Sequence, residues 1–169
     1  MREGPRSGCP INAAVEALGD RWSLIVLRDV IFGRRRHFRD LLAHSEEGIA
    51  SNILSSRLKA LVAGGLLSHE ENGRGRRGTY SLTEAGIQTV PIMVALGSWG
   101  LRHRETTPEL AVRAQLLEDG GPPLWENFMD ELRELHLGTP LPHPERPRAS
   151  EALQRAYEEA LARVTAPAA

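Results

Sequence analysis

The spacing of apolar and polar residues predicts a series of short helices in the first part of the chain. Residues 10–18 start with Pro10, which suits the first position of a helix, and they carry an apolar stripe of Ile11, Ala14, Val15 and Leu18. Gly19 ends this pattern, and Asp20 is a typical N-cap for the next helix. Four apolar side chains of this second helix are expected to face a core: Trp22, Ile25, Val26 and Val30.

A short helix over residues 37–44 is followed by the turn sequence SEEG and by a longer helix that ends at Gly64-Gly65. At 3.6 residues per turn, the longer helix has two different faces. Its apolar face is expected to be buried and consists of Leu54, Leu58, Leu61 and Val62. The opposite face is polar and slender, with Ser51 at its start, Arg57 on its flank, and Asn52, Ser55, Ser56 and Lys59 at its centre.

The pattern then changes from helical to alternating. The segments LLSHEE (66–71) and TYSLT (79–83) predict two antiparallel strands, joined by the loop NGRGRRG. Thr83 is expected to cap a helix over residues 84–105, in which Pro91 predicts a kink or two abutting helices. The predicted fold class is therefore mainly α with a small antiparallel β-hairpin. We expect a winged helix-turn-helix, responsible for DNA binding and dimerisation, over residues 9–104 and an acidic helical extension over residues 105–169.

Composition argues against several classes of protein. No apolar run approaches the ~18 residues of a membrane span, and the first ten residues lack the apolar core of a signal peptide, so a cytoplasmic protein without a membrane partner is expected. A single cysteine excludes an internal disulfide framework and a thiolate zinc site. The six histidines show no paired metal spacing, so neither a metal nor a cofactor is expected.

The net charge of −1 conceals an asymmetry along the chain. Residues 1–105 hold 15 Lys and Arg against 11 Asp and Glu, whereas residues 106–169 hold 6 against 11. A basic first part and an acidic tail indicate that only the first part meets a polyanion.

Double-stranded DNA is the polyanion that this arrangement favours. A helix that enters a major groove needs slender side chains with donors and acceptors for base edges, and a basic hairpin tip can hold the neighbouring backbone. Asn52 can pair with adenine, Ser51, Ser55 and Ser56 with several bases, and Arg57 and Lys59 with guanine or phosphate. The remaining candidate contacts are basic: Arg34, Arg35, Arg36 and Arg39 near the start of the short helix, and Arg74, Arg76 and Arg77 in the loop. Taken singly, the polar face fits a solvated surface and the loop an ordinary hairpin connection; their adjacency favours DNA.

Several segments together resemble the HxlR-type winged-helix transcriptional regulators, which are related to the MarR group. They are CPINAAVEALGDRWSLIVLRDVIFG, HFRDLL, GIASNILSSRLKALVAGGLL and GTYSLTEAG followed by MVALGSWG, within residues 9–104. The resemblance implies a bacterial homodimer that binds a palindromic operator and regulates transcription, and we expect it to be a repressor. Family members often have Arg directly before the Phe of the short helix, where His37 stands here. A phosphate contact at position 37 is therefore doubtful, and Arg36 could substitute.

Cys9, at the start of the first helix, has two interpretations. A thiol at a helix N-terminus forms thiolate readily and is sensitive to oxidants, and the resemblance implies that a cysteine here serves as the redox sensor in several relatives. Alternatively, Cys9 is a small residue without a switching role, and the protein responds to a small-molecule effector or to another signal.

Other functions are weaker candidates. Trp99, Trp125, Phe128 and Met129 could line a ligand pocket, but such side chains are more often packed in a core. No nucleophile or general-acid motif is present, so an enzyme is not expected. The two alternatives to a DNA-binding regulator are a winged-helix protein-interaction module and a ligand-binding protein.

Overall fold

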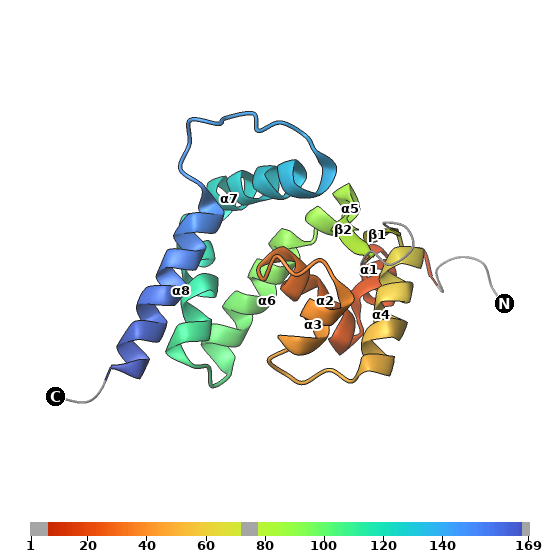
Figure 1. Ribbon diagram of the computed structural model, residues 1–169, viewed down its shortest axis with the longest axis horizontal. Helices are drawn as coiled ribbons and strands as arrows, with labels where there is room; N and C mark the ends of the chain where they lie inside the picture. Colours follow the sequence, from red (N-terminus) through yellow and green to blue (C-terminus); the bar gives the residue numbers. More distant parts are fainter. Residues whose placement is uncertain (1–6, 72–77, 167–169) are drawn as a thin grey trace. The chain divides into compact units, whose positions relative to one another are not determined.

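The computed structural model describes residues 7–71 and 78–166, which form two compact units with a boundary between Gly86 and Ile87. In chain order, the first unit contains α1 (Pro10–Leu18), α2 (Arg21–Ile31), α3 (Phe38–Ala43), α4 (Ser51–Ala63), β1 (Leu67–Glu70) and β2 (Thr79–Leu82). α5 (Glu84–Ile87) spans the boundary, and the second unit continues with α6 (Val90–His103), α7 (Pro108–Leu137) and α8 (Ala149–Thr165). Figure 1 shows these elements. The predicted fold class, mainly helical with one small hairpin, is confirmed.

The core of the first unit lies between α2, α3 and α4. The buried side chains are Val26, Leu27, Val30 and Ile31 of α2, Leu41 of α3, and Leu54, Leu58 and Leu61 of α4. Asp20 caps α2 as predicted, because its carboxylate accepts a hydrogen bond from the Ser23 amide at 3.0 Å. Trp22 and Ile25, which were expected in the core, are only half-buried, since α2 turns Leu27 and Ile31 inward instead. Val62 of α4, also expected to be buried, is half-buried as well.

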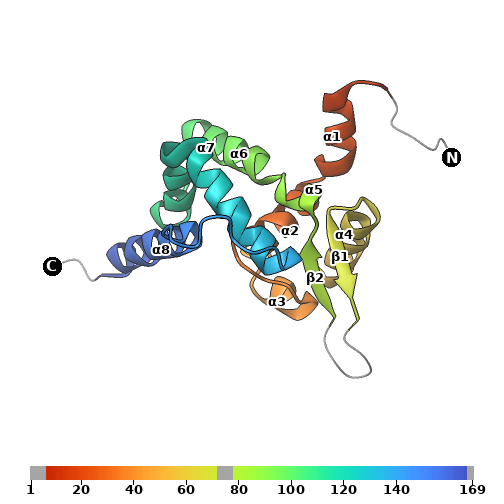
Figure 2. The same ribbon diagram turned by 90° about the horizontal axis from the view of Figure 1, so that it is seen from above.

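α1 differs from its neighbours because none of its residues is buried. Its predicted apolar stripe includes Ile11, which is 74% exposed, and the exposed Val15. In Figure 2 the helix stands away from the group formed by α2, α3 and α4. The predicted helix is confirmed, but none of the residues that the structure describes covers its apolar stripe.

The hairpin follows α4 directly. Gly65 takes a positive φ of 72°, a conformation that favours glycine, and the chain then enters β1. β1 and β2 are antiparallel, with Leu67 opposite Leu82 and His69 opposite Tyr80. Both strands match the prediction, and Thr83 caps α5 by accepting a hydrogen bond from the Gly86 amide at 3.1 Å.

The second unit is helical. Residues 84–103 form the two abutting helices that Pro91 predicted, α5 and α6, with Pro91 in the first turn of α6. α7 is broken at Gly121, whose φ of 58° and ψ of −163° are not helical, and Pro122 and Pro123 follow. α8 packs beside α7, where the Arg113 guanidinium lies over the ring of Tyr157 and donates to Gln154 at 2.7 Å.

Candidate nucleic-acid interface

α4 presents one face to the core and the opposite face to solvent. Leu54, Leu58 and Leu61, spaced three or four residues apart, are buried. The exposed residues of this helix are Ser51, Asn52, Ser56, Lys59, Ala60 and Ala63, and Ser55 is half-buried. Because all of the exposed side chains except Lys59 are short, another surface can approach the helix backbone closely.

Polar groups on this exposed face have unused hydrogen-bonding capacity. Within the described residues, the side chains of Ser51, Asn52 and Lys59 form no hydrogen bond or ion pair with the rest of the protein. The amide of Asn52 has donors and an acceptor, the hydroxyl of Ser51 has both, and the ammonium of Lys59 has three donors. These are the groups that pair with base edges and phosphates in a major groove.

Arg57 is held at the side of α4 by its own domain. Its guanidinium lies 3.3 Å from the carboxylate of Asp20, the residue that caps α2, and it also donates to the hydroxyl of Ser56 at 3.3 Å. The Arg57 Nε is buried without a hydrogen-bond partner among the described residues. Arg57 therefore links α4 to the start of α2, and a contact between Arg57 and DNA stays a prediction.

Arg36 and Arg39, two of the basic candidates near α3, lie in different surroundings. Arg36 contacts β2: its Nε donates to the Tyr80 carbonyl at 3.2 Å and its guanidinium also donates to the hydroxyl of Ser81. The Tyr80 amide in turn donates to the Arg36 carbonyl at 2.8 Å, so Arg36 lies along the edge of β2 that is not paired with β1. Arg39 is exposed and has no ion pair among the described residues. Of the two, Arg39 is better placed to contact a phosphate.

His37 also connects this segment to the hairpin. It is the N-cap residue of α3, and its Nδ1 lies 3.0 Å from the carbonyl oxygen of Gly78, directly before β2. This contact gives His37 a structural role. Arg74, Arg76 and Arg77 lie outside the described residues, and their contact with DNA stays a prediction.

Cys9 is exposed at the start of α1. It occupies the N-cap position, its side chain makes no capping hydrogen bond, and its amide donates to the hydroxyl of Ser7 at 3.3 Å. Its position at the helix start is as expected, whereas its role as a redox sensor stays a prediction.

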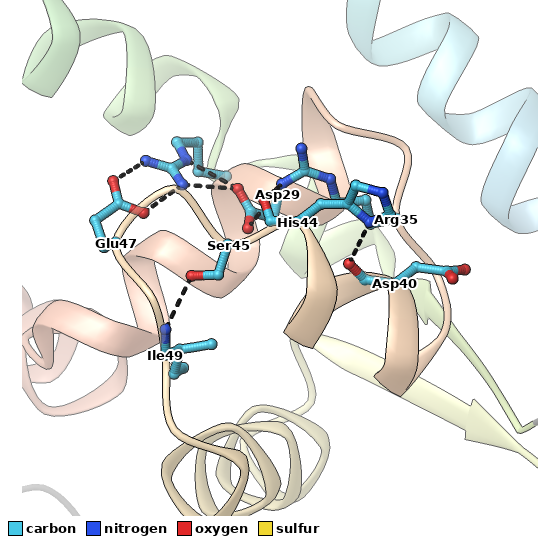
Figure 3. A network of polar contacts seen from close by, with 8 residues as sticks. Asp29, Arg35, Asp40, His44, Ser45, Glu47 and Ile49 are labelled. Atoms are coloured by element: carbon cyan, nitrogen blue, oxygen red, sulfur yellow. Dashed lines mark hydrogen bonds and ion pairs between the residues drawn. The ribbon is translucent and has the colours of Figure 1, made fainter.

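An ionic network that sequence reasoning missed joins α2 to the turn before α4 (Figure 3). Asp29 lies on α2, and its side chain is only 7% exposed. Arg28 donates to Asp29 at 2.8 and 3.0 Å and to Glu47 at 2.5 and 2.8 Å, and Arg35 approaches Asp29 at 3.2 Å. The one available signal was an aspartate between the apolar residues Leu27 and Val30 of a buried helix.

The pairing of Arg28 with Glu47 shifts the pKa values of both side chains. The hydrogen bond from Arg28 lowers the pKa of Glu47 below its ordinary value. Burial alone would lower the pKa of Arg28, but the hydrogen bond to Glu47 and the negative charge of Asp29 together raise that pKa. Arg28 and Glu47 are therefore both charged at neutral pH.

The aromatic side chains of the C-terminal unit have partners within the protein. Phe128 and Met129 are buried, and the Trp125 indole donates to the Leu117 carbonyl at 2.6 Å across the break in α7. Trp99 is 49% exposed, with the guanidinium of Arg104 over its ring. Among the described residues, no cluster of His, Cys, Asp or Glu has the geometry of a metal site, and no helix there is long and apolar enough to cross a membrane.

Comparison with known proteins identifies the same segment. Residues 17–108 match the family described as HxlR-like helix-turn-helix. A protein of Mycobacterium tuberculosis H37Rv, described as an uncharacterized HTH-type transcriptional regulator, is 39% identical over 94 residues, which cover 55% of this chain and 58% of that protein. The chain thus spans a little over half the length of this relative. YdeP of Bacillus subtilis 168, with the same description, is 27% identical over 106 residues, covering 61% of this chain and 80% of YdeP.

Among solved structures, the chain is similar to the crystal structure of PA1607, a candidate transcription factor. The superposition has a TM-score of 0.54 at 30% sequence identity and covers 60% of this chain and 69% of PA1607. The match supports the arrangement of helices and hairpin described above.

Proposed function

The chain belongs to the HxlR-like helix-turn-helix family, and on this premise we propose that it is a dimeric transcriptional repressor that binds a palindromic operator. The observation that carries the proposal is the outer face of α4. Leu54, Leu58 and Leu61 fix this helix to the core, and the opposite face leaves Ser51, Asn52, Ser56 and Lys59 exposed. Such a helix suits the major groove of duplex DNA.

Within each subunit, the proposal divides the contacts into two kinds. Asn52 and the serines of α4 read base edges, whereas Lys59, Arg39 and the loop residues Arg74, Arg76 and Arg77 contact the phosphate backbone. Backbone contacts give affinity for every sequence, and base contacts give preference for one sequence.

Two exposed apolar surfaces support a dimer. On α6, Ile92, Leu96 and Trp99 are exposed and lie on one helical face, because they are spaced four and three residues apart. On α1, Ile11 and Val15 are likewise exposed at a spacing of four. A twofold dimer reads two half-sites about one helical turn apart, ~34–36 Å, which explains why a palindromic operator is expected. Occupation of such an operator blocks a promoter.

The first test is fluorescence anisotropy on the full chain in its reduced form. DNA from upstream of the gene for this protein is titrated in parallel with a shuffled duplex of equal length at physiological salt. A preference of ~10³ or more for the native fragment supports an operator-binding regulator. Equal and weak binding to both duplexes contradicts an operator beside the protein's own gene and favours either a remote operator or a protein-interaction module.

Mutations separate the two kinds of contact. Asn52→Ala is expected to weaken operator binding by ~1–3 kcal/mol and to relax sequence preference, whereas Arg76→Ala weakens binding to all duplexes alike. With these basic contacts from both subunits, affinity is expected to fall by ~10³–10⁵ between 50 and 200 mM salt. If both variants lost affinity equally on every duplex, the division between base and backbone contacts would be wrong.

The signal that the regulator senses requires a separate test. If Cys9 is a redox sensor, mild peroxide produces a covalent dimer on non-reducing gels and changes DNA affinity, and Cys9→Ser abolishes both effects. If neither effect occurs, Cys9 has no switching role, and a small-molecule effector becomes the better candidate.

A further inference from the structure

The first turn of α4 is not held by a cap of its own. Its N-cap residue is Ala50, whose side chain cannot accept a hydrogen bond. Instead, Ser45 accepts a hydrogen bond from the Ile49 amide at 3.2 Å, Ile49 is buried, and Gly48 turns the chain with a φ of 66°. The position of Ser51 and Asn52 therefore depends on how residues 45–49 are held.

Glu47 provides a charged anchor for this segment. Both of its carboxylate oxygens accept hydrogen bonds from the Arg28 guanidinium, at 2.5 and 2.8 Å, in the paired geometry that fixes both distance and orientation. Arg28 is in turn fixed by Asp29, so the turn before α4 is attached to the buried face of α2. Figure 3 shows Glu47 and Asp29 facing each other across this bridge.

The same aspartate also holds the segments on either side of α3. Arg35 lies 3.2 Å from the Asp29 carboxylate, its amide donates to the Asp29 carbonyl at 3.2 Å, and its guanidinium donates to the His44 carbonyl at 2.5 Å. Asp29 thus connects α2 with Arg35, and Arg35 in turn binds His44, the C-cap residue of α3. Charged contacts as well as apolar packing therefore hold the end of α3 and the turn before α4 against α2.

We propose that Glu47, paired with Arg28, is a positioning residue for sequence-specific DNA recognition: it holds the turn that places Ser51 and Asn52. This inference rests on the proposed function. A side-chain contact with a base edge requires a defined helix position, whereas attraction to phosphates tolerates a looser one. Loss of the Glu47–Arg28 pair is therefore expected to reduce operator preference more than general DNA affinity.

If Glu47 acted only through its negative charge, replacing it would have the opposite effect on DNA binding. The measurement therefore distinguishes positioning from simple repulsion. Replacing a glutamate beside a DNA-binding surface removes repulsion from phosphates and raises affinity for any duplex. The neighbouring Glu46 provides a matched control, because it is exposed in the same turn and has no ion pair among the described residues. Glu46→Gln and Glu47→Gln remove the same charge from adjacent positions, and only the second removes a partner of Arg28.

The experiment compares both variants and the wild type on the native and shuffled duplexes. For Glu47→Gln we expect operator preference to fall about tenfold, which corresponds to about 1.4 kcal/mol, with no loss on shuffled DNA. Glu46→Gln should keep the wild-type preference. Arg28→Lys, which retains the charge but not the paired geometry, should behave like Glu47→Gln. Equal preference in the wild type and Glu47→Gln would overturn the inference.

Hydrogen exchange of the DNA-free chain shows whether the role of Glu47 alone is wrong or whether the proposed function is wrong. Amides of residues 47–52 should exchange faster in Glu47→Gln than in Glu46→Gln. If the wild type shows no operator preference, the proposed function fails, and DNA positioning fails with it. If the wild type shows preference but exchange and preference are alike in the two variants, only the role of Glu47 is wrong.

Discussion

The starts of α4 and α8 meet the same physical requirement in different ways. Neither helix has a capping hydrogen bond from its own N-cap side chain, Ala50 in one and Arg148 in the other. At α8, Glu131 of α7 reaches across and accepts hydrogen bonds from the amides of Ala149 and Ser150, at 2.5 and 3.2 Å. At α4, Glu47 contacts no amide of the helix and instead anchors the preceding turn to Arg28.

The two carboxylates, Glu131 and Glu47, also differ in their exposure to solvent. Glu131 is 3% exposed, whereas the Glu47 side chain is 38% exposed. A buried carboxylate that satisfies two helix amides contributes mainly to stability, because its removal leaves buried donors unpaired. An exposed ion pair contributes little to stability and can still define where a turn lies. The comparison indicates that the C-terminal unit uses its carboxylate for stability and the helix-turn-helix unit uses its carboxylate for position.

The largest effect is expected at α8. Glu131→Ala leaves the first two amides of the helix without acceptors and should destabilise the protein by about 2–4 kcal/mol, a decrease in Tm of roughly 5–10 °C. Thermal unfolding by circular dichroism measures the shift. Glu134→Ala is the matched control, since Glu134 lies one turn along α7 and pairs with the exposed Arg148. Equal effects of the two substitutions would mean that the buried Glu131 contributes no more to stability than the exposed Glu134–Arg148 pair.

An intermediate effect is expected at α2, the helix with a conventional cap. Asp20→Ala removes the hydrogen bond to the Ser23 amide and should destabilise the protein by about 1 kcal/mol. Asp20→Asn retains a capping acceptor and loses only the charge that pairs with Arg57, so its effect should be smaller. Chemical denaturation of the two variants measures the difference. If Asn were as damaging as Ala, the ion pair with Arg57 would be more important than the cap.

Sequence patterns anticipated features that depend on neighbouring residues. The Asp20 cap, the buried face of α4, the glycine stop at Gly64-Gly65, the two strands and the helix break at Pro91 all follow from local periodicity or local backbone chemistry. The same patterns placed Asn52 and Lys59 on an exposed face.

Features that join distant residues were not anticipated. Arg28 and Glu47 are 19 positions apart, and Glu131 and Ala149 are 18 apart, so no helical or strand period relates them. For the same reason, sequence reasoning assigned Arg36 to DNA without detecting its bonds to β2, and it placed Trp22 and Ile25 deeper than they lie. An apolar stripe identifies a face but not the element that covers it, as the uncovered stripe of α1 shows.

The smallest expected effect is the pH dependence of the stability that the Glu47–Arg28 pair contributes. Pairing with Arg28 lowers the pKa of Glu47 in the folded protein from the ordinary value of 4.5. A carboxylate with a lowered folded pKa contributes its full stability above the unfolded value and loses it as the pH falls through the folded value. The free energies of unfolding of the wild type and Glu47→Gln should therefore differ by at most about 1 kcal/mol at pH 7, because the pair is partly exposed.

This difference should stay constant down to about pH 5.5 and shrink below about pH 4.5, where protonation makes Glu47 resemble glutamine. It should also shrink in high salt, which screens exposed ion pairs. Denaturant unfolding at several pH values measures it, with Glu46→Gln expected to show no such change. A difference of several kcal/mol would instead mean that Glu47 stabilises its helix as strongly as Glu131 does. The two helix starts would then be alike, and the loss of operator preference in Glu47→Gln would reflect partial unfolding.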